Sequence, residues 1–166
     1  MALADTLLEE LEQEAVTTRR VLERVPEKNL NWRPHEKSRT LGELALHIAN
    51  TPGGVAQLAS SPSPAQVPQF TDPSPQTTAE LLVALDQSIA QARKVLTGMD
   101  DATAISVLRI VDGEREVFSV PRIGLLRSIM LNHWYHHRGQ LSVYLRELNV
   151  PIPSIYGPSA DENPFA

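Results

Sequence analysis

Apolar residues recur at steps of three and four along most of this chain, with charged and polar residues between them. That spacing is typical of helices that bury one face and expose the other. Pro26 interrupts the first stripe and Gly98 follows the third, which places helix ends there. The pattern predicts four helices, over about residues 4–25, 40–59, 77–97 and 121–148.

Two of the predicted helices begin with the same signal. Thr40 precedes the second helix with Glu43 three residues later, and Thr77 precedes the third with Glu80. This spacing is that of a capping box, in which each side chain bonds the other residue's backbone N–H. Within the second helix, Thr51–Gly54 contains a proline and two glycines, so we expect a kink or an end there and a shifted continuation to about residue 59.

One segment departs from the helical pattern. The runs Ile105–Val111 and Glu114–Phe118 are rich in β-prone residues and flank Asp112-Gly113, a strong hairpin signal. We therefore expect a small β-hairpin, packed against the helices, before the last helix. Residues 60–76 contain five prolines among serines, threonines and glutamines, and suit neither helix nor strand.

Length and composition then limit the class of protein. The 166 residues and 18.3 kDa fit a single domain over residues 1–166, and four amphipathic helices pack most simply as an all-α four-helix bundle. The chain lacks cysteine, which excludes disulfides and restricts any metal site to nitrogen and oxygen ligands.

Charge and hydropathy exclude some partners. The formal net charge is −5, the sequence pI is about 5.5, and no cluster of Lys and Arg is present, which argues against a nucleic-acid partner. The N-terminus is acidic and helix-like rather than a signal peptide, and no apolar run approaches a membrane span. We expect a soluble cytoplasmic protein.

The stretch from His133 to Gln140 holds three of the five histidines. His133 and His137 are four residues apart inside the apolar row of the last predicted helix, so they lie one above the other and can direct their ring nitrogens at one ion. His47, on the second helix beside that helix's apolar stripe, is the best candidate for a third ligand. A three-histidine site leaves coordination positions open, which is typical of catalytic metal sites.

At these residues the sequence resembles the DinB-like superfamily of small metal-binding helical bundles, a group that includes YfiT-like hydrolases. The resemblance covers essentially the whole chain, and the block His136-His137-Arg138-Gly139-Gln140 with one upstream histidine is its most specific part. It is carried by Trp32–Pro34, Leu41–Ile48, Leu131–Leu141 and Val150–Glu162.

The resemblance implies a divalent metal ion, often zinc or nickel, held by one histidine of the second helix and two of the fourth. In this sequence those are His47, His133 and His137. It also implies a homodimer, and its characterised relatives include S-transferases and isomerases that use a low-molecular-weight thiol.

Other readings apply to several of these residues. A histidine pair on a buried helix face is more often satisfied by carbonyl groups or water than by a metal. Glu43 could be a fourth ligand or a general base, but its place in the capping box explains it better. His136 is expected at the surface or beside the ligands, and His35 in solvent.

The residues around the block have two readings each. Gln140 and Tyr144 continue the histidine face and could orient a ligand or pack in the core. Arg138 is expected to point outward, where it could contact a second subunit, the C-terminal tail or a substrate. In the tail, we expect Tyr156 to be anchored against the body. The acids at 161 and 162 could fold back over the mouth of the bundle, although we favour a solvated position for them.

Two classes of function follow. The first is a metal-dependent enzyme acting on a small molecule, either a thiol S-transferase or a hydrolase. Neither metal-bearing helix carries a clear general base, which favours the transferase mildly. The second is a non-catalytic binding or dimerisation module whose metal joins two helices. An enzyme needs a solvent-connected cavity, whereas a structural ion should be closed off by a fourth protein ligand.

Overall fold

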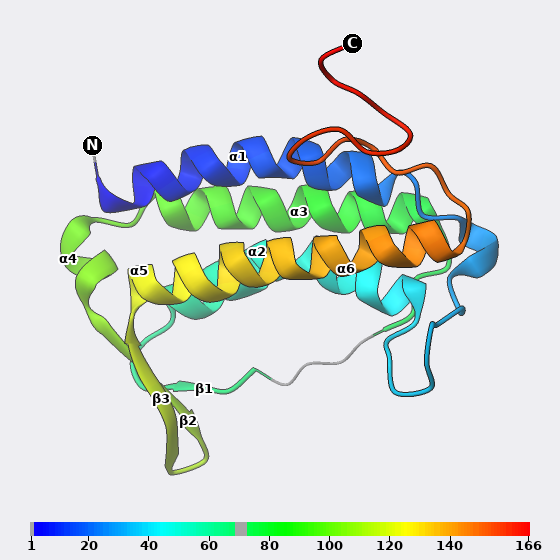
Figure 1. The fold of residues 1–166 in the computed structure, drawn as a ribbon. Helices are drawn as coiled ribbons and strands as arrows, with labels where there is room; N and C mark the ends of the chain where they lie inside the picture. The colour runs from blue at the N-terminus through cyan, green and yellow to red at the C-terminus, as the bar shows by residue number, and fades with distance from the viewer. Residues whose placement is uncertain (1, 69–72) are drawn as a thin grey trace.

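The computed structural model describes residues 2–68 and 73–166, and most of them are helical. Four helical stretches are long, and short elements connect them (Figure 1). The elements are α1 (Leu3–Leu22), η1 (Glu27–Asn29), α2 (Leu41–Ser60), β1 (Ala65–Gln66), α3 (Thr78–Thr97), α4 (Asp101–Ile105), β2 (Val107–Asp112), β3 (Arg115–Pro121), α5 (Arg122–Leu125), η2 (Leu126–Asn132) and α6 (His133–Glu147).

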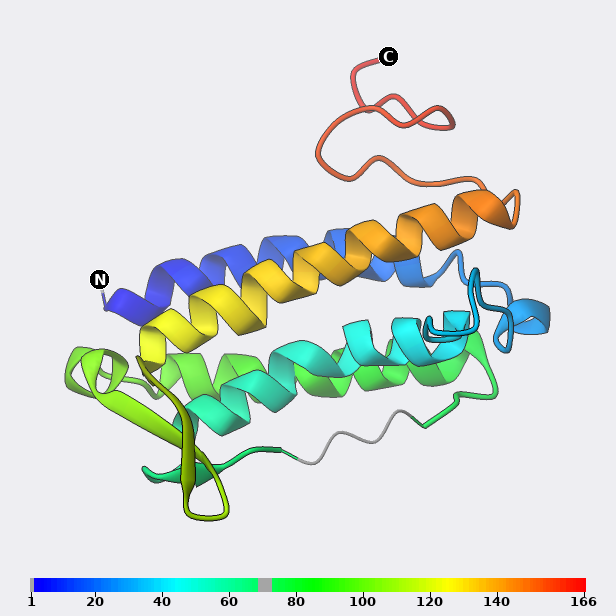
Figure 2. The same ribbon diagram turned by 60° about the horizontal axis from the view of Figure 1, so that its bottom comes forward.

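The long helices pack around one core. α1 contacts α3, α3 contacts α2, α2 contacts α6, and α6 contacts α1, which closes the ring of a bundle. Figure 2 shows α1 and α6 in one layer and α2 and α3 in the other. Each helix contributes fully buried apolar side chains to the space between the layers, among them Leu11, Ile48, Leu85 and Leu141. The mainly helical body is therefore as predicted.

The capping box predicted at the start of α2 forms in full, whereas the one predicted at the start of α3 forms only in part. At α2, Thr40 Oγ1 accepts from the backbone N–H of Glu43 at 3.1 Å, and Glu43 Oε2 accepts from the N–H of Thr40 at 2.7 Å. At α3, Thr77 Oγ1 accepts from the N–H of Glu80 at 3.2 Å. Glu80, however, accepts from the N–H of Gln76, so the second box is a simple cap.

α2 continues through the Thr51–Gly54 segment without ending. Gly53 lies directly against α3, and a Cβ atom at this position would be 2.9 Å from the Cα atom of Ser88. The Gly53 N–H donates to Ser88 Oγ at 2.8 Å. The glycine therefore permits the close approach of the two helices, and packing against α3 supports the helix across its proline.

The predicted fourth helix is continuous as α5, η2 and α6, but its middle is π-helical. A π-helical turn holds more residues than an α-turn, because its hydrogen bonds join residues five apart. Of the two histidines predicted inside the buried row, His137 is buried and His133 is half-buried. The core row beside them consists of fully buried side chains, one of them charged: Leu126, Met130, Trp134, Arg138, Leu141 and Leu145.

The hairpin is confirmed and belongs to a three-stranded mixed sheet at one end of the bundle. β2 and β3 pair antiparallel, and Gly113 in their turn has a φ of 63°, which favours glycine. Two expectations were wrong. Ile105 ends α4 instead of opening a strand, and the segment 60–76 contains β1, which pairs parallel to β2. Residues 69–72 of that segment lie outside the described part of the chain.

The C-terminal tail lies over α1 and α6 (Figure 1). Asp161 accepts from Arg146 at 2.5 Å and Glu162 pairs with Arg20, so both acids, expected in solvent, hold the tail down. The hydroxyl of Tyr156 is anchored as expected, although most of its side chain is exposed.

Arg138 corrects a further expectation, since it points inward and is only 1 % exposed. Its guanidinium lies 2.6 Å from the carboxylate of Glu14 on α1 and bonds the hydroxyl groups of Thr18 and Tyr156. These partners compensate its charge, which permits the burial. Among the described helices, none combines the length and hydropathy needed to cross a lipid bilayer.

Candidate metal centre

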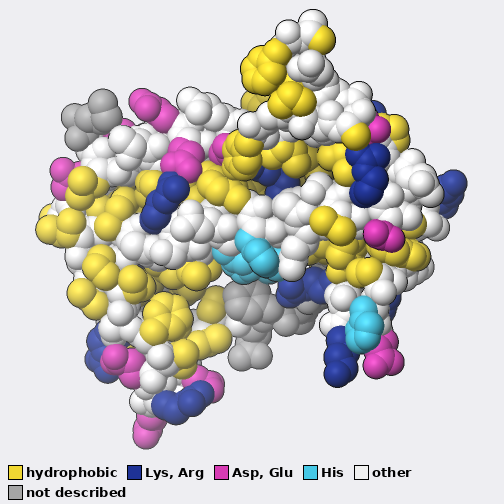
Figure 3. Space-filling model, in the orientation of Figure 1, with side chains coloured by type: hydrophobic (Ala, Val, Ile, Leu, Met, Phe, Trp, Pro, Cys, Tyr) yellow, Lys and Arg dark blue, Asp and Glu magenta, His cyan; other side chains and the backbone are white. Residues whose placement is uncertain are grey.

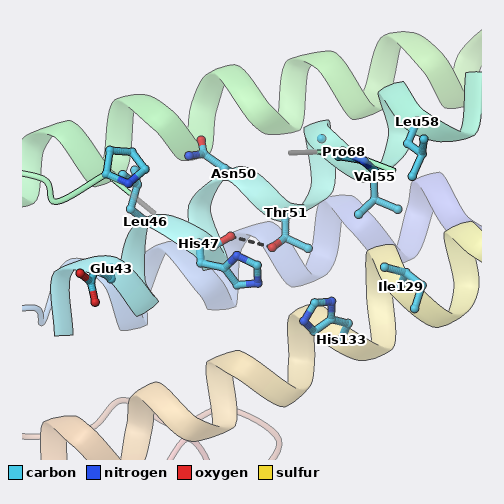
Figure 4. Close-up of a pocket in the computed structure, with 12 residues that line it drawn as sticks. Glu43, Leu46, His47, Asn50, Thr51, Val55, Leu58, Pro68, Ile129 and His133 are labelled. Atoms are coloured by element: carbon cyan, nitrogen blue, oxygen red, sulfur yellow. Dashed lines mark hydrogen bonds between the residues drawn. The ribbon is translucent and has the colours of Figure 1, made fainter. Parts of the chain in front are cut away.

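Two helices bring the three predicted histidines together. His47 comes from the second turn of α2, and His133 and His137 come from the first two turns of α6. The four-residue spacing stacks the α6 pair on one helix face. Contact between α2 and α6 then places the His47 ring beside both. Figure 4 shows His47 and His133 facing each other from their two helices.

The donor atoms of the three rings converge. One ring nitrogen from each histidine lies within 4.8 Å of the other two. The ring centroids are 5.4 Å apart for His47 and His133, 4.7 Å for His47 and His137, and 4.3 Å for the α6 pair. The Nε2 atoms of the α6 pair are 2.5 Å apart.

The environment keeps the α6 histidines neutral. Burial lowers the pKa of His137 to about 4, against the opposing effect of its hydrogen bond to Gln140. Burial also lowers the pKa of His133, as do the neighbouring His136 and Arg39, which oppose a second positive charge there. A neutral imidazole has a nitrogen lone pair available for coordination, so these shifts prepare the rings to bind a metal ion at neutral pH.

Gln140 fixes the orientation of one ring. Its Oε1 lies 2.7 Å from His137 Nδ1 and accepts that nitrogen's proton, which leaves the Nε2 lone pair of His137 directed at the other histidines. Of the two roles considered for Gln140, orientation of a ligand is therefore the one that its contacts support.

Two histidines of the cluster line a cavity of about 220 Å³. Figure 3 shows histidine side chains at the surface in the middle of this face of the molecule. His47 and His133 lie at the wall, and Glu43, Asn50 and Thr51 supply its other polar side chains (Figure 4). The remaining lining is mainly apolar: Leu46, Val55, Leu58, Pro68, Pro73 and Ile129, with Gly54.

The donor set fits a divalent ion. Tetrahedral ligands at zinc–nitrogen distances of about 2.0–2.1 Å lie about 3.3 Å from one another. The three donor atoms all lie within 4.8 Å of one another, and the Nε2 atoms of the α6 pair are 2.5 Å apart, so the observed separations are close to that spacing. Within residues 2–68 and 73–166, no fourth His, Asp or Glu joins this group. The three histidines are therefore the side chains that would hold the ion, and the cavity beside them leaves room for a small molecule to approach it. Three imidazoles suit zinc, nickel and copper alike.

The other residues considered in the sequence do not belong to the three-histidine cluster. His136 is exposed beside His137, and His35 is exposed in the connector before α2, where its Nδ1 accepts from the N–H of Lys37. Tyr144 packs edge-on against Trp32 with ring centroids 5.6 Å apart, which assigns it to packing. Glu43 caps α2 as predicted and also lines the cavity.

Sequence reasoning missed Asn50, Thr51 and Ile129, which line the cavity beside the histidines, and the role of Trp134. Asn50 and Thr51 follow His47 by about one turn of α2, which was the available signal for them. Ile129 lies one turn before His133 in η2. The indole Nε1–H of Trp134 donates to the carbonyl oxygen of Ile48 at 2.9 Å. This contact joins two helices, and no residue spacing in the sequence predicts it.

Fold and site together define a class: small helical bundles with a three-histidine cluster between two neighbouring helices. The sequence matches the DinB superfamily over residues 10–141, and the chain belongs to that family.

Individual relatives agree with this assignment. The chain is similar to the uncharacterized protein YrdA of Bacillus subtilis (strain 168), with 26% identity over 159 residues that cover 95% of this chain and 90% of YrdA. Its fold is similar to that of a DinB-like protein from Bacillus cereus ATCC 10987, with a TM-score of 0.72 and 19% identity over 92% of this chain and 97% of that one. The DinB-like protein YjoA of Bacillus subtilis gives a TM-score of 0.65 and 20% identity over 87% and 92% of the two chains.

Proposed function

We propose that this protein binds one divalent metal ion, zinc or nickel, through His47, His133 and His137. We propose further that it transfers a low-molecular-weight thiol to a small electrophile. The observation that carries the proposal is that two of the three histidines form the wall of a mainly apolar cavity. A purely structural ion would be enclosed by protein ligands instead of facing a cavity.

The apolar and the polar residues that line the cavity would have different roles. The apolar lining would hold the carbon skeleton of the electrophile and exclude water from it. Asn50 and Thr51 offer polar groups at one wall, although the Thr51 hydroxyl already donates to the carbonyl oxygen of His47 at 2.6 Å. When bound, a divalent ion supplies Lewis acidity that favours the thiolate form of a thiol.

Transfer is favoured over hydrolysis because of Glu43. Among the described residues that line the cavity it is the one carboxylate, and its Oε2 is engaged in capping α2. A hydrolase would need a group positioned to take a proton from water. A preformed thiolate needs no such base. Its sulfur attacks the electrophilic carbon, a C–S bond forms, the bond to the leaving group breaks, and the thiol proton passes to the buffer.

The metal is tested first. The untagged protein, His137→Ala and the matched control His35→Ala are purified, incubated with zinc or nickel and analysed for metal content. We expect about one equivalent per chain in wild type and in the control, and a large loss in His137→Ala. Wild-type protein that holds no metal under any of these conditions would refute the proposal.

The reaction is tested next. The metal-loaded protein is mixed with 1-chloro-2,4-dinitrobenzene and cysteine, glutathione or 2-mercaptoethanol, with the chelated protein as control. We expect the loaded protein to accelerate the displacement of chloride by sulfur above the uncatalysed rate, and the chelated protein to leave that rate unchanged. Metal-dependent cleavage of p-nitrophenyl acetate without thiol transfer would identify the hydrolase instead. Metal that raises thermal stability while neither reaction occurs would identify a structural ion. A homodimer is likewise proposed, and sedimentation velocity tests it.

A further inference from the structure

Pro52 leaves one carbonyl group of α2 without its usual partner inside the helix. In an α-helix, each N–H donates to the carbonyl oxygen four residues earlier, and proline has no N–H to donate. Four residues before Pro52 is Ile48, which is fully buried. A buried carbonyl oxygen without a donor is unfavourable, so another group must supply the hydrogen bond.

Trp134 of α6 supplies it. Its indole Nε1–H donates to the carbonyl oxygen of Ile48 at 2.9 Å, and its ring is also fully buried. An indole ring has one hydrogen-bond donor and no acceptor, so it can donate to the Ile48 carbonyl, for which Pro52 supplies no N–H. The bond therefore joins α2 to α6 in the dry interior of the bundle.

The position of this bond along both helices is what links it to the metal centre. Ile48 directly follows His47 on α2, and Trp134 directly follows His133 on α6. A hydrogen bond with fixed length and direction at this point restricts both the sliding and the rotation of α6 against α2. The same two motions would separate the His47 ring from the α6 pair.

We propose that Trp134 is a positioning residue for the metal centre. Its hydrogen bond to the Ile48 carbonyl, which Pro52 makes available, holds His47 in register with His133 and His137. The inference rests on the metal binding in the proposed function and is independent of the transferase reaction.

A double-mutant cycle separates this role from packing. The variants are Pro52→Ala, Trp134→Phe and the two combined, and the readout is the zinc dissociation constant from competition with a chelating dye. In the protein that retains Pro52, Trp134→Phe should weaken zinc binding on the order of tenfold. In the Pro52→Ala protein, the new N–H at position 52 can bond the Ile48 carbonyl, so the same substitution should cost less than about threefold.

Trp32→Phe is the matched control. It is the same chemical change at the other tryptophan, which packs on Tyr144 away from this bond, and it should leave zinc affinity unchanged. An equal loss of affinity from Trp134→Phe with and without Pro52→Ala would overturn the proposal, because packing alone acts regardless of the residue at position 52.

A second readout does not depend on whether Trp134→Phe folds or on whether zinc binds. The chain has two tryptophans, so Trp32→Phe leaves a single indole N–H signal in a nitrogen-15 NMR spectrum. With Pro52 in place that signal should be strongly protected from hydrogen exchange, and Pro52→Ala should shift it and accelerate its exchange. An unprotected signal with Pro52 in place, or one that Pro52→Ala leaves unchanged, would contradict the bond. Wild type without zinc affinity would refute the proposed metal binding and leave this result standing.

Discussion

Replacing Arg138 with methionine should lower the free energy of unfolding by about 3 kcal/mol. The guanidinium is 1 % exposed and the Glu14 side chain 15 %, with 2.6 Å between nitrogen and oxygen. Removing one partner of a buried ion pair costs about 3–5 kcal/mol, because the other charge is left uncompensated. The lower value applies here, since Glu14 retains some solvent and the hydroxyl of Tyr156, which donates to it at 2.9 Å.

The loss can be measured by thermal unfolding, followed by circular dichroism in the presence of a chelator so that bound metal does not contribute. For a chain of this size, 1 kcal/mol corresponds to about 2–4 °C in Tm, so the expected decrease is about 6–12 °C. Urea unfolding gives the free energy independently, and an unchanged m-value would show that the fold is retained.

Arg146→Met is the matched control. It is the same substitution on the same helix, but its pair with Asp161 is solvent-exposed, so the expected loss is much smaller than for Arg138→Met. Combining Arg138→Met with Glu14→Leu removes both buried charges and should restore much of the stability. If Arg138→Met costs no more stability than Arg146→Met, or if the double variant is no more stable than the single one, the buried ion pair does not have the stabilising role assigned to it.

Two further predictions concern single hydrogen-bonding groups. Gln140→Ala removes the acceptor of His137 Nδ1 and should weaken zinc binding about 10–100-fold in a chelator competition. The Tm of the metal-free protein should not change, because residue 140 is exposed. An unchanged zinc affinity would contradict the orienting role. Arg146 holds the pKa of Asp161 below its ordinary value, so this carboxylate stabilises the tail above its unfolded pKa of about 3.9 and loses that effect as the pH falls through its lower folded pKa. The Ile152 amide donates to Asp161, so its hydrogen exchange at neutral pH should be faster in Asp161→Asn than in wild type. That difference in exchange rate should vanish well below pH 4. A difference that persists in acid would refute the assignment.

The elements that could be predicted from the chain alone are those whose causes lie within a few residues of one another. The cap of α2 depends on Thr40 and Glu43, three positions apart, and forms as expected. The hairpin depends on Asp112-Gly113 between two β-prone runs. The stacking of His133 and His137 follows from helical geometry alone. Such local interactions are largely independent of the rest of the chain, so spacing and residue type suffice to predict them.

The residues that α6 buries in the core, and the groups that its histidines contact, depend on packing between distant segments and could not be predicted from local sequence. The π-helical turn before His133 places Arg138 in the core row, where Glu14, more than a hundred residues away, makes its burial possible. The strand pairing of Ala65 with β2 depends on a neighbour that local sequence does not contain. The position of His47 depends on how α2 packs against α6, through contacts such as the bond from Trp134 to Ile48. These features arise from burial and from hydrogen bonds between distant segments, whose free energies depend on which groups the folded chain brings together.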